Sequence, residues 1–243
     1  MKYLMDLHTH SVAGGHAYST VKENMEMAYL HGMKVYGLSE HAPAMPGGPH
    51  EFFFGNLKVL PKEYKGMRVL VGVEANIMDL EGTLDLSENR LKLLDYCIAS
   101  QHISCVKPGS ARENTDSLIK AMQNPYVCVI GHPDDSRYPL EYERLVEAAR
   151  RYHVLLEVNN SSMNPLNARQ NAEENIPAYL ELCKKYQASI LLGTDAHYCD
   201  AVGMFDEADA ILKQVDFPQE LIINLDPNRL WGYLKKSRET YEV

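Results

Sequence analysis

The chain has 243 residues, of which 45% are hydrophobic and 23% are charged, as in an ordinary soluble globular protein. This length suits one α/β barrel, so we expect a single domain over residues 1–243. The formal net charge of −9 argues against a general basic surface, and no long nucleic acid is expected as a partner.

The sequence also bounds the compartment. Residues 1–10 contain no apolar leader core, and no apolar run is long enough to cross a bilayer. The five cysteines are odd in number and form no Cys-x-x-Cys pair, which is typical of free thiols in a reducing compartment. We therefore expect a cytoplasmic protein with no membrane partner.

Seven apolar runs recur at intervals of about 30 residues, the length of a βα unit. Most are nearly continuous in Val, Ile and Leu, as in parallel strands that are buried on both faces. The predicted strands are residues 3–7, 34–38, 68–73, 96–99, 126–130, 154–158 and 190–192. This alternation with helices predicts a parallel α/β barrel, with the chemistry at the carboxyl ends of the strands.

Helix signals lie between these runs. Thr20 and Glu23 form a capping-box pattern that opens a helix, and Gly32 can end it. Pro177 is expected in the first turn of a later helix. The further predicted helices are residues 140–152, 176–186, 203–215 and 227–236.

Two other segments have predicted roles. Residues 42–56 contain three prolines and three glycines and follow a candidate ligand, which predicts an irregular active-site loop. Residues 114–116 could open a helix whose backbone N–H groups bind an anion.

Metal-binding side chains gather at the ends of the predicted strands. Seven of the ten histidines and two carboxylates lie at or just after the end of a run: His8, His10, His16, His41, Glu74, His102, His132, Asp195 and His197. Imidazoles and carboxylates on one face form a transition-metal site, and nine exceed the roughly four ligands of one tetrahedral ion. The pattern predicts two or three ions, with Glu74 suited to bridge two of them.

The spacing supports this prediction. His8 and His10 are two residues apart and point to the same side of an extended chain. Asp195 and His197 have the same spacing. Asp6 shares the parity of His8 and is expected to orient a ligand. Glu40 is expected beside the ligands or in solvent.

Other residues have weaker claims. Position alone leaves His16 as readily a surface residue as a ligand. The remaining histidines, His31, His50 and His153, are expected to play no part in metal binding.

A cluster of this kind predicts hydrolysis. Metal ions lower the pKa of bound water and can clamp a phosphoryl group, so Glu74 and Asp195 are expected to be catalytic as well as ligating. Three divalent ions against two carboxylates leave a positive pocket that suits a phosphomonoester. Asn160 and Ser161 are candidate substrate donors or simple turn caps, and Arg169 is a candidate phosphate clamp or a surface charge.

Together, these motifs resemble the PHP (polymerase and histidinol phosphatase) family over essentially the whole chain. The similarity is greatest to stand-alone bacterial PHP phosphatases of the YcdX type, through the stretches DLHTH, HAYST, GVEANI, EVNNSS and GTDAH and the later VDFP and LIIN. The resemblance implies a distorted (β/α)7 barrel and a site for three divalent ions, usually zinc, with iron or manganese in relatives. It also implies a homo-oligomer such as a trimer.

The resemblance further implies how the ions are shared. One ion would take His8, His10, Glu74 and Asp195, and Glu74 would bridge to a second ion. That second ion would take His102 and His132, and a third would take His16, His41 and His197. The chain departs from the family at Glu40, where Asp is common, and at Asp134 and Asp135, where a Gly is frequent.

We therefore expect a metal-dependent phosphatase that hydrolyses small phosphomonoesters by metal-activated hydroxide. Three alternatives stay open. The chain could cleave phosphodiesters as a nuclease on short oligonucleotides, it could be specific for histidinol phosphate, or it could be a non-catalytic metal-binding scaffold. The acidic net charge argues against a nuclease, and the intact set of nine predicted ligands argues against a non-catalytic scaffold.

Overall fold

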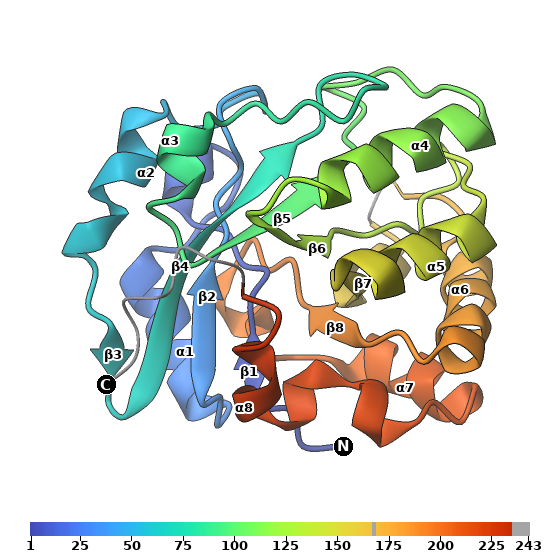
Figure 1. The fold of residues 1–243 in the computed structure, drawn as a ribbon. Coiled ribbons are helices and arrows are strands. Elements are labelled where there is room, and N and C mark those ends of the chain that lie inside the picture. Colours follow the sequence, from blue (N-terminus) through green and yellow to red (C-terminus); the bar gives the residue numbers. More distant parts are fainter. Residues whose placement is uncertain (167–168, 235–243) are drawn as a thin grey trace.

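The computed structural model describes residues 1–166 and 169–234, and it shows a nearly closed barrel of seven parallel strands (Figure 1). Each strand pairs with the next one along the chain. The strands are β1 (Met5–Asp6), β2 (Val35–Leu38), β4 (Met67–Asn76), β5 (Tyr96–Ser100), β6 (Val127–Ile130), β7 (Leu155–Asn159) and β8 (Ile190–Gly193). Each predicted run overlaps one of them, which confirms the predicted barrel. A short strand that was not predicted, β3 (Glu63–Tyr64), pairs antiparallel with β4.

The barrel closes between β1 and β8 through side-chain hydrogen bonds and an isolated bridge rather than a continuous ladder. Asn224 lies between β1 and β8, and its Nδ2 donates to the carbonyl oxygens of Met5 (3.0 Å) and Leu192 (2.8 Å). Its Oδ1 accepts the backbone N–H of Leu192 at 2.7 Å. Nearer the carboxyl ends, a single parallel bridge joins Thr9 to Ala196. This sparse seam is the distortion in the barrel.

Helices cover the outside of the strands (Figure 1). Helix α1 begins after the predicted capping box, in which Thr20 and Glu23 bond to each other's backbone. Helix α5 packs against both α4 and α6. The helices are α1 (Val21–Leu30), α2 (Phe52–Asn56), α3 (Glu88–Leu91), α4 (Ala111–Met122), α5 (Tyr142–Tyr152), α6 (Ala172–Tyr186), α7 (Asp206–Gln214) and α8 (Pro227–Leu230).

Short 3-10 turns follow several strands and line the carboxyl end of the barrel. They include η1 (Val12–Gly14) after β1, η3 (Asn160–Met163) after β7 and η4 (Cys199–Ala201) after β8. The others are η2 (Leu57–Val59), η5 (Gln219–Leu221) and η6 (Ile223–Leu225).

Some predicted boundaries were wrong. Helix α6 begins at Ala172, so Pro177 lies in its second turn, where Pro removes one helical hydrogen bond. Burial of apolar side chains on the core face of α6 offsets that cost. Residues 52–56 of the predicted loop form α2, with Phe54 buried. Helix α8 ends at Leu230, and residues 235–236 of the predicted helix lie outside the described residues.

The predicted anion site at residues 114–116 was also wrong. Helix α4 begins at Ala111, where Ser110 and Glu113 already bond the first free N–H groups. Asn114 is buried and donates instead to the carbonyl oxygens of Gly109 and Pro139. The capping box at Ser110, three residues before Glu113, was the sequence signal for the true start.

Two apolar clusters surround the strands. The smaller one takes one buried residue or more from every barrel strand, which places it inside the barrel. The larger one fills the space between the strands and the helices. The interior is therefore packed, and the chemistry is confined to its carboxyl end. Within the described residues, no helix is long and apolar enough to cross a membrane.

Candidate metal centre

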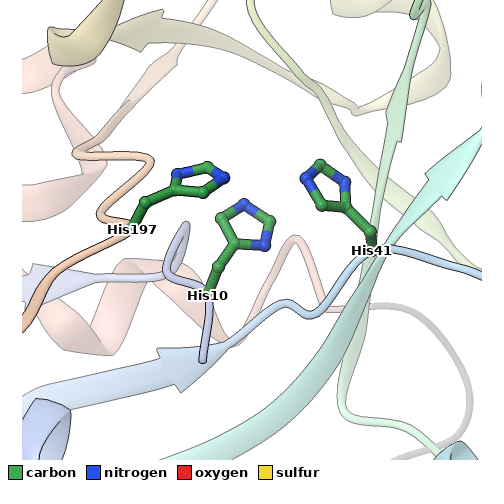
Figure 2. Close-up of side chains that lie close together, drawn as sticks. All are labelled: His10, His41 and His197. Atoms are coloured by element: carbon green, nitrogen blue, oxygen red, sulfur yellow. The ribbon is translucent and has the colours of Figure 1, made fainter. Parts of the chain in front are cut away.

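All nine predicted ligands meet at the carboxyl end of the barrel. Figure 2 shows His10, His41 and His197 converging from the ends of β1, β2 and β8. The ring centroids of His10 and His41 lie 4.2 Å apart, and those of His10 and His197 lie 4.5 Å apart. His16 joins them from its exposed loop, with its ring centroid 4.9 Å from that of His41 and 4.8 Å from that of His197.

Glu74 lies at the centre of the cluster, between two groups of imidazoles. Its Oε1 lies 2.9 Å from His132 Nε2 and 3.2 Å from His102 Nε2. Its Oε2 lies 2.7 Å from His41 Nδ1, 3.4 Å from His8 Nε2 and 3.5 Å from His10 Nε2. The two oxygens thus face different donor groups, which is the arrangement that a carboxylate bridging two ions requires.

The donor atoms around His8 fit a divalent transition metal. Asp195 Oδ1 lies 3.6 Å from His8 Nε2 and 3.1 Å from His10 Nε2. A tetrahedral ion with bonds of about 2.1 Å separates its ligand atoms by about 3.4 Å, close to these values. His8 Nε2 and Glu74 Oε2 are buried and have no hydrogen-bond partner among the described residues. Because such atoms are costly to bury unpaired, a metal ion is the partner that their chemistry calls for.

Hydrogen bonds at the other ring nitrogen hold several imidazoles in place. The Nδ1 atoms of His197 and His16 lie 2.9 Å and 3.1 Å from the carbonyl oxygens of Asp195 and Gly14. A carbonyl oxygen can only accept, so each Nδ1 carries the hydrogen. That leaves each Nε2 as the atom able to bind a metal.

Two further side chains lie against the Nδ1 atoms of imidazoles. His102 Nδ1 lies 2.8 Å from Asn76 Oδ1, and Asn76 Nδ2 in turn donates to Asp85. Beside His10, Glu40 Oε1 lies 3.5 Å from Nδ1, while Glu40 Oε2 accepts the hydroxyl of Ser11. Glu40 is thus buried next to a predicted ligand rather than solvated.

Glu157 is the important residue that sequence reasoning missed. It is buried in the middle of β7, and its Oε1 lies 2.6 Å from His8 Nδ1. Its Oε2 accepts the backbone N–H of His132 at 2.7 Å and an N–H of Asn159 at 3.1 Å. One side chain therefore positions predicted ligands from two strands. The available signal was an acid within the otherwise apolar run 154–158.

Asp6 acts differently from the prediction. Its carboxylate accepts the Thr194 hydroxyl at 2.5 Å and the backbone N–H groups of Gly203 at 2.9 Å and His8 at 3.3 Å. It therefore fixes the backbone where β1 and β8 meet, rather than orienting a ligand's side chain. Burial raises the pKa of Asp6 to about 6, against the effect of these hydrogen bonds.

The shifted pKa values keep Glu74 ionised and keep two of the imidazoles neutral, and these are the protonation states that bind metals. Burial raises the pKa of Glu74, but the imidazoles of His41 and His102 outweigh it and hold this pKa well below its usual range. Burial and nearby His10 lower the pKa of His41 to about 3. Burial and the Arg169 guanidinium also lower the pKa of His132. Charged carboxylates and neutral imidazoles are the ligating forms.

Two of the predicted ligands have left-handed backbone conformations. The φ angle is +28° at His132 and +53° at Asp195. Conformations of this kind in residues other than glycine cost about 1–3 kcal/mol and persist where the surrounding contacts enforce them. Each residue lies just after a strand, so the turn brings its side chain back over the barrel.

The predicted substrate residues do not all lie in one place. Asn160 and Ser161 line a cleft of about 750 Å³ that also borders Asp195 and His197. The Oδ1 of Asn160 accepts the backbone N–H of Ala208 at 3.0 Å. Arg169, by contrast, donates to Asp195 Oδ2 at 2.8 Å and contacts the side of that carboxylate away from His8.

Comparison with known proteins places the chain in a family. The model of the PHP domain matches residues 6–164. A probable phosphatase of Clostridium botulinum (strain Hall) is 45% identical over 235 residues, which cover 97% of this chain and 96% of that protein. A probable phosphatase of Clostridium novyi (strain NT) is 46% identical over 235 residues, with the same coverage of both chains. The chain belongs to the PHP family, and the expectation of a metal-dependent phosphatase is confirmed at that level.

Solved structures share the fold at low identity. Histidinol phosphate phosphatase of Lactococcus lactis, solved with zinc, L-histidinol and phosphate, is 18% identical with a TM-score of 0.62. The match covers 89% of this chain and 95% of that one. A chain of an archaeal ribonuclease P, solved with mature tRNA, is 14% identical with a TM-score of 0.56, and the match covers 94% of this chain and 87% of that one.

Proposed function

We propose that the nine clustered residues hold three divalent ions and that the protein hydrolyses small phosphomonoesters there. The observation that carries the proposal is the position of Glu74, whose two oxygens face separate groups of imidazoles. A bridging carboxylate is needed only where ions lie close together. The contacts of His8, His10 and Asp195 support one ion, and those of His102 and His132 support a second. His16, His41 and His197 are assigned to the third.

The balance of charge favours a phosphate monoester as substrate. Glu74 and Asp195 are the two carboxylates among the nine ligands, so three divalent ions would leave a positive site. When bound, the ions supply positive charge for phosphoryl oxygens and a water molecule acidified toward neutral pH. A phosphomonoester dianion gains more from that charge than a diester monoanion does. Zinc is the proposed metal because imidazole donors predominate, with iron or manganese as alternatives.

The chain's own residues would orient the substrate beside the ions. Asn160 and Ser161 line the cleft that reaches Asp195 and His197. Because the Oδ1 of Asn160 already accepts a backbone N–H, its amide is held with Nδ2 as the donor. We assign these two side chains to hydrogen bonds with the leaving group or the phosphate. A homo-oligomer, such as a trimer, is our proposal for the assembly.

The test is phosphate release by metal-reconstituted protein from a panel of phosphomonoesters that includes histidinol phosphate. A chelator-treated sample is the control, and a short oligonucleotide and a phosphodiester complete the panel. We expect release from monoesters that chelation abolishes. Protein that holds its metals yet releases phosphate from no monoester would overturn the proposal, in favour of diester cleavage or a non-catalytic scaffold.

A further inference from the structure

Arg169 is held by protein acceptors at both of its terminal nitrogens. One nitrogen, NH2, donates to Asp195 Oδ2 at 2.8 Å. The other, NH1, donates to Asn159 Oδ1 and to Ser162 Oγ, both at 3.1 Å. The side chain is only 11% exposed. The guanidinium is therefore part of a buried network that begins on β7 and ends at a predicted metal ligand.

In this network, the two carboxylate oxygens of Asp195 contact different groups. Oδ2 accepts from Arg169, whereas Oδ1 faces His8 Nε2 and His10 Nε2. A carboxylate at a strand end could otherwise rotate and exchange its oxygens. A charge-assisted hydrogen bond in a buried setting is strong enough to select one orientation. The orientation selected is the one that points Oδ1 at the imidazoles.

Arg169 is not among the described residues that line the cleft bordering the ligands. That cleft is lined by residues that include Asn160, Ser161 and His197. Arg169 lines a neighbouring cavity of about 330 Å³, which adjoins the cleft at Asn164 and Pro165. To reach a phosphate in the cleft, its guanidinium would have to give up a charge-assisted hydrogen bond to the buried Asp195 carboxylate, which is a strong interaction.

We propose that Arg169 is a positioning residue, which holds Asp195 by Oδ2 so that Oδ1 binds the ion shared with His8 and His10. Arg169 does not bind the phosphate of the substrate. The proposal rests on the proposed metal site and assigns Arg169 a role other than the phosphate clamp expected from the sequence. Loss of the Arg169 side chain should therefore lower the affinity for metal more than the affinity for substrate.

The first experiment measures metal affinity without any need for activity. Zn²⁺ dissociation constants are measured by chelator competition on metal-free Arg169→Gln and Arg169→Lys, and the visible absorption of the Co²⁺ forms is recorded. The control is Arg144→Gln, since Arg144 pairs with Asp116 and Glu141 on the surface of α4 and α5. We expect Arg169→Gln to raise the dissociation constant of one Zn²⁺ ion by about 10- to 100-fold and to alter the Co²⁺ spectrum. Arg169→Lys recovers part of the loss, and Arg144→Gln matches the parent protein.

The second experiment separates positioning from phosphate binding. At saturating metal, we expect Arg169→Gln to lower kcat while KM and the inhibition constant of inorganic phosphate change by less than about threefold. A phosphate inhibition constant that rises tenfold or more, with unchanged metal affinity, would overturn the proposal. If the parent protein hydrolyses nothing, the proposed function fails, but the metal affinities still decide the role of Arg169.

A third variant covers the case in which Arg169→Gln does not fold. Ser162→Ala removes one anchor of the guanidinium and keeps its charge. We expect weaker Zn²⁺ binding in Ser162→Ala, by a smaller factor than in Arg169→Gln. Parent-like metal affinity in both Ser162→Ala and Arg169→Lys would contradict the positioning role.

Discussion

Glu157 Oε1 lies 2.6 Å from His8 Nδ1, although the two residues are 149 positions apart in the chain. The pair is buried, and it joins the interior of β7 to the end of β1. A carboxylate on Nδ1 fixes the ring orientation and makes Nε2 a better metal donor. The geometry at His8 therefore depends on a residue that would bind no metal itself.

Replacement of this partner tests that dependence. We expect Glu157→Gln to weaken metal binding by about 10- to 100-fold, because the amide supports His8 less strongly than the carboxylate does. Isothermal titration with Zn²⁺ on metal-free protein measures the change. Glu143→Gln, at an exposed residue of α5 that pairs with Lys185, is the matched control and should bind metal as the parent does.

Gly193 makes room for the same pair. A Cβ atom at Gly193 would lie 1.9 Å from Glu157 Oε1 and 2.8 Å from His8 Cβ. We expect Gly193→Ala to lower the free energy of unfolding by about 1–3 kcal/mol, in addition to weakening metal binding. Urea denaturation measures the loss. Gly232→Ala, where the nearest atom would lie 3.6 Å away, should change stability by less than about 0.5 kcal/mol.

The proposed third ion would depend on His16, which is exposed. We expect His16→Ala to reduce the bound metal from three ions to two and to leave the other ligands in place, because the His16 loop contributes little to the core. Elemental analysis of the purified protein measures the ratio. His50→Ala removes an exposed histidine outside the cluster and should retain three ions. Equal metal content in the two variants would exclude His16 as a ligand.

Metal binding should release protons. Burial lowers the pKa of His10, but hydrogen bonding to the carboxylates of Asp195 and Glu40 outweighs it and raises this pKa to about 9. Burial also lowers the pKa of His8, but the carboxylate of Glu157 outweighs burial and raises this pKa well above its usual value. Both imidazoles are thus protonated at neutral pH in the metal-free protein, and each must lose its proton to bind.

The sign of the pH dependence follows from these two groups. Affinity for Zn²⁺ should rise as the pH increases from 7 toward 9, with about two protons released per protein near pH 7.5. The metal-free protein should show the opposite trend. Its folded state binds more protons than the unfolded chain between the unfolded pKa of about 6.5 and pH 9, so its stability is lost as the pH rises through that interval. Calorimetry in buffers of different ionisation enthalpy counts the protons, and a count of zero would contradict this assignment.

The seam of the barrel gives a stability prediction. Asn224→Ala would leave the carbonyl oxygens of Met5 and Leu192 and one backbone N–H without their partner. We expect a loss of about 2–5 kcal/mol in the free energy of unfolding, measured by urea denaturation. Asn228→Ala, which removes an exposed hydrogen bond to Asp226, is the control and should cost less than about 1 kcal/mol.

The sequence was sufficient to predict the strands and the nine clustered residues, because both depend on local patterns. Buried parallel strands are apolar runs, and ligands follow them directly, as Glu74 follows residues 68–73. The partners of those ligands were not predictable in this way. Glu157 and Asn76 lie within strands, and only the closed barrel shows which imidazole each one meets.

Other differences have the same origin. From the sequence, Arg169 was a candidate phosphate clamp or a surface charge; in the structure it donates to Asp195, a contact that its position in the chain did not indicate. Asn224 ends the LIIN stretch of the family resemblance, but no local pattern indicates its structural role, which depends on two strands that are far apart in the sequence. Sequence proximity does not determine such contacts, since they form between elements that only the complete fold brings together.

The position of Asn224 also constrains the order in which the protein can fold. As the chain emerges from the ribosome, β1 can pair with β2 early, but its other edge gains partners only when residues 194–196 and then Asn224 have been synthesised. Until then, β1 and β8 are edge strands of an open sheet, and such edges can pair with other chains. The slow step should therefore be the docking of this late segment. Asp195 and His197 could join the histidines of the first strands only when that final step brings the two edges together.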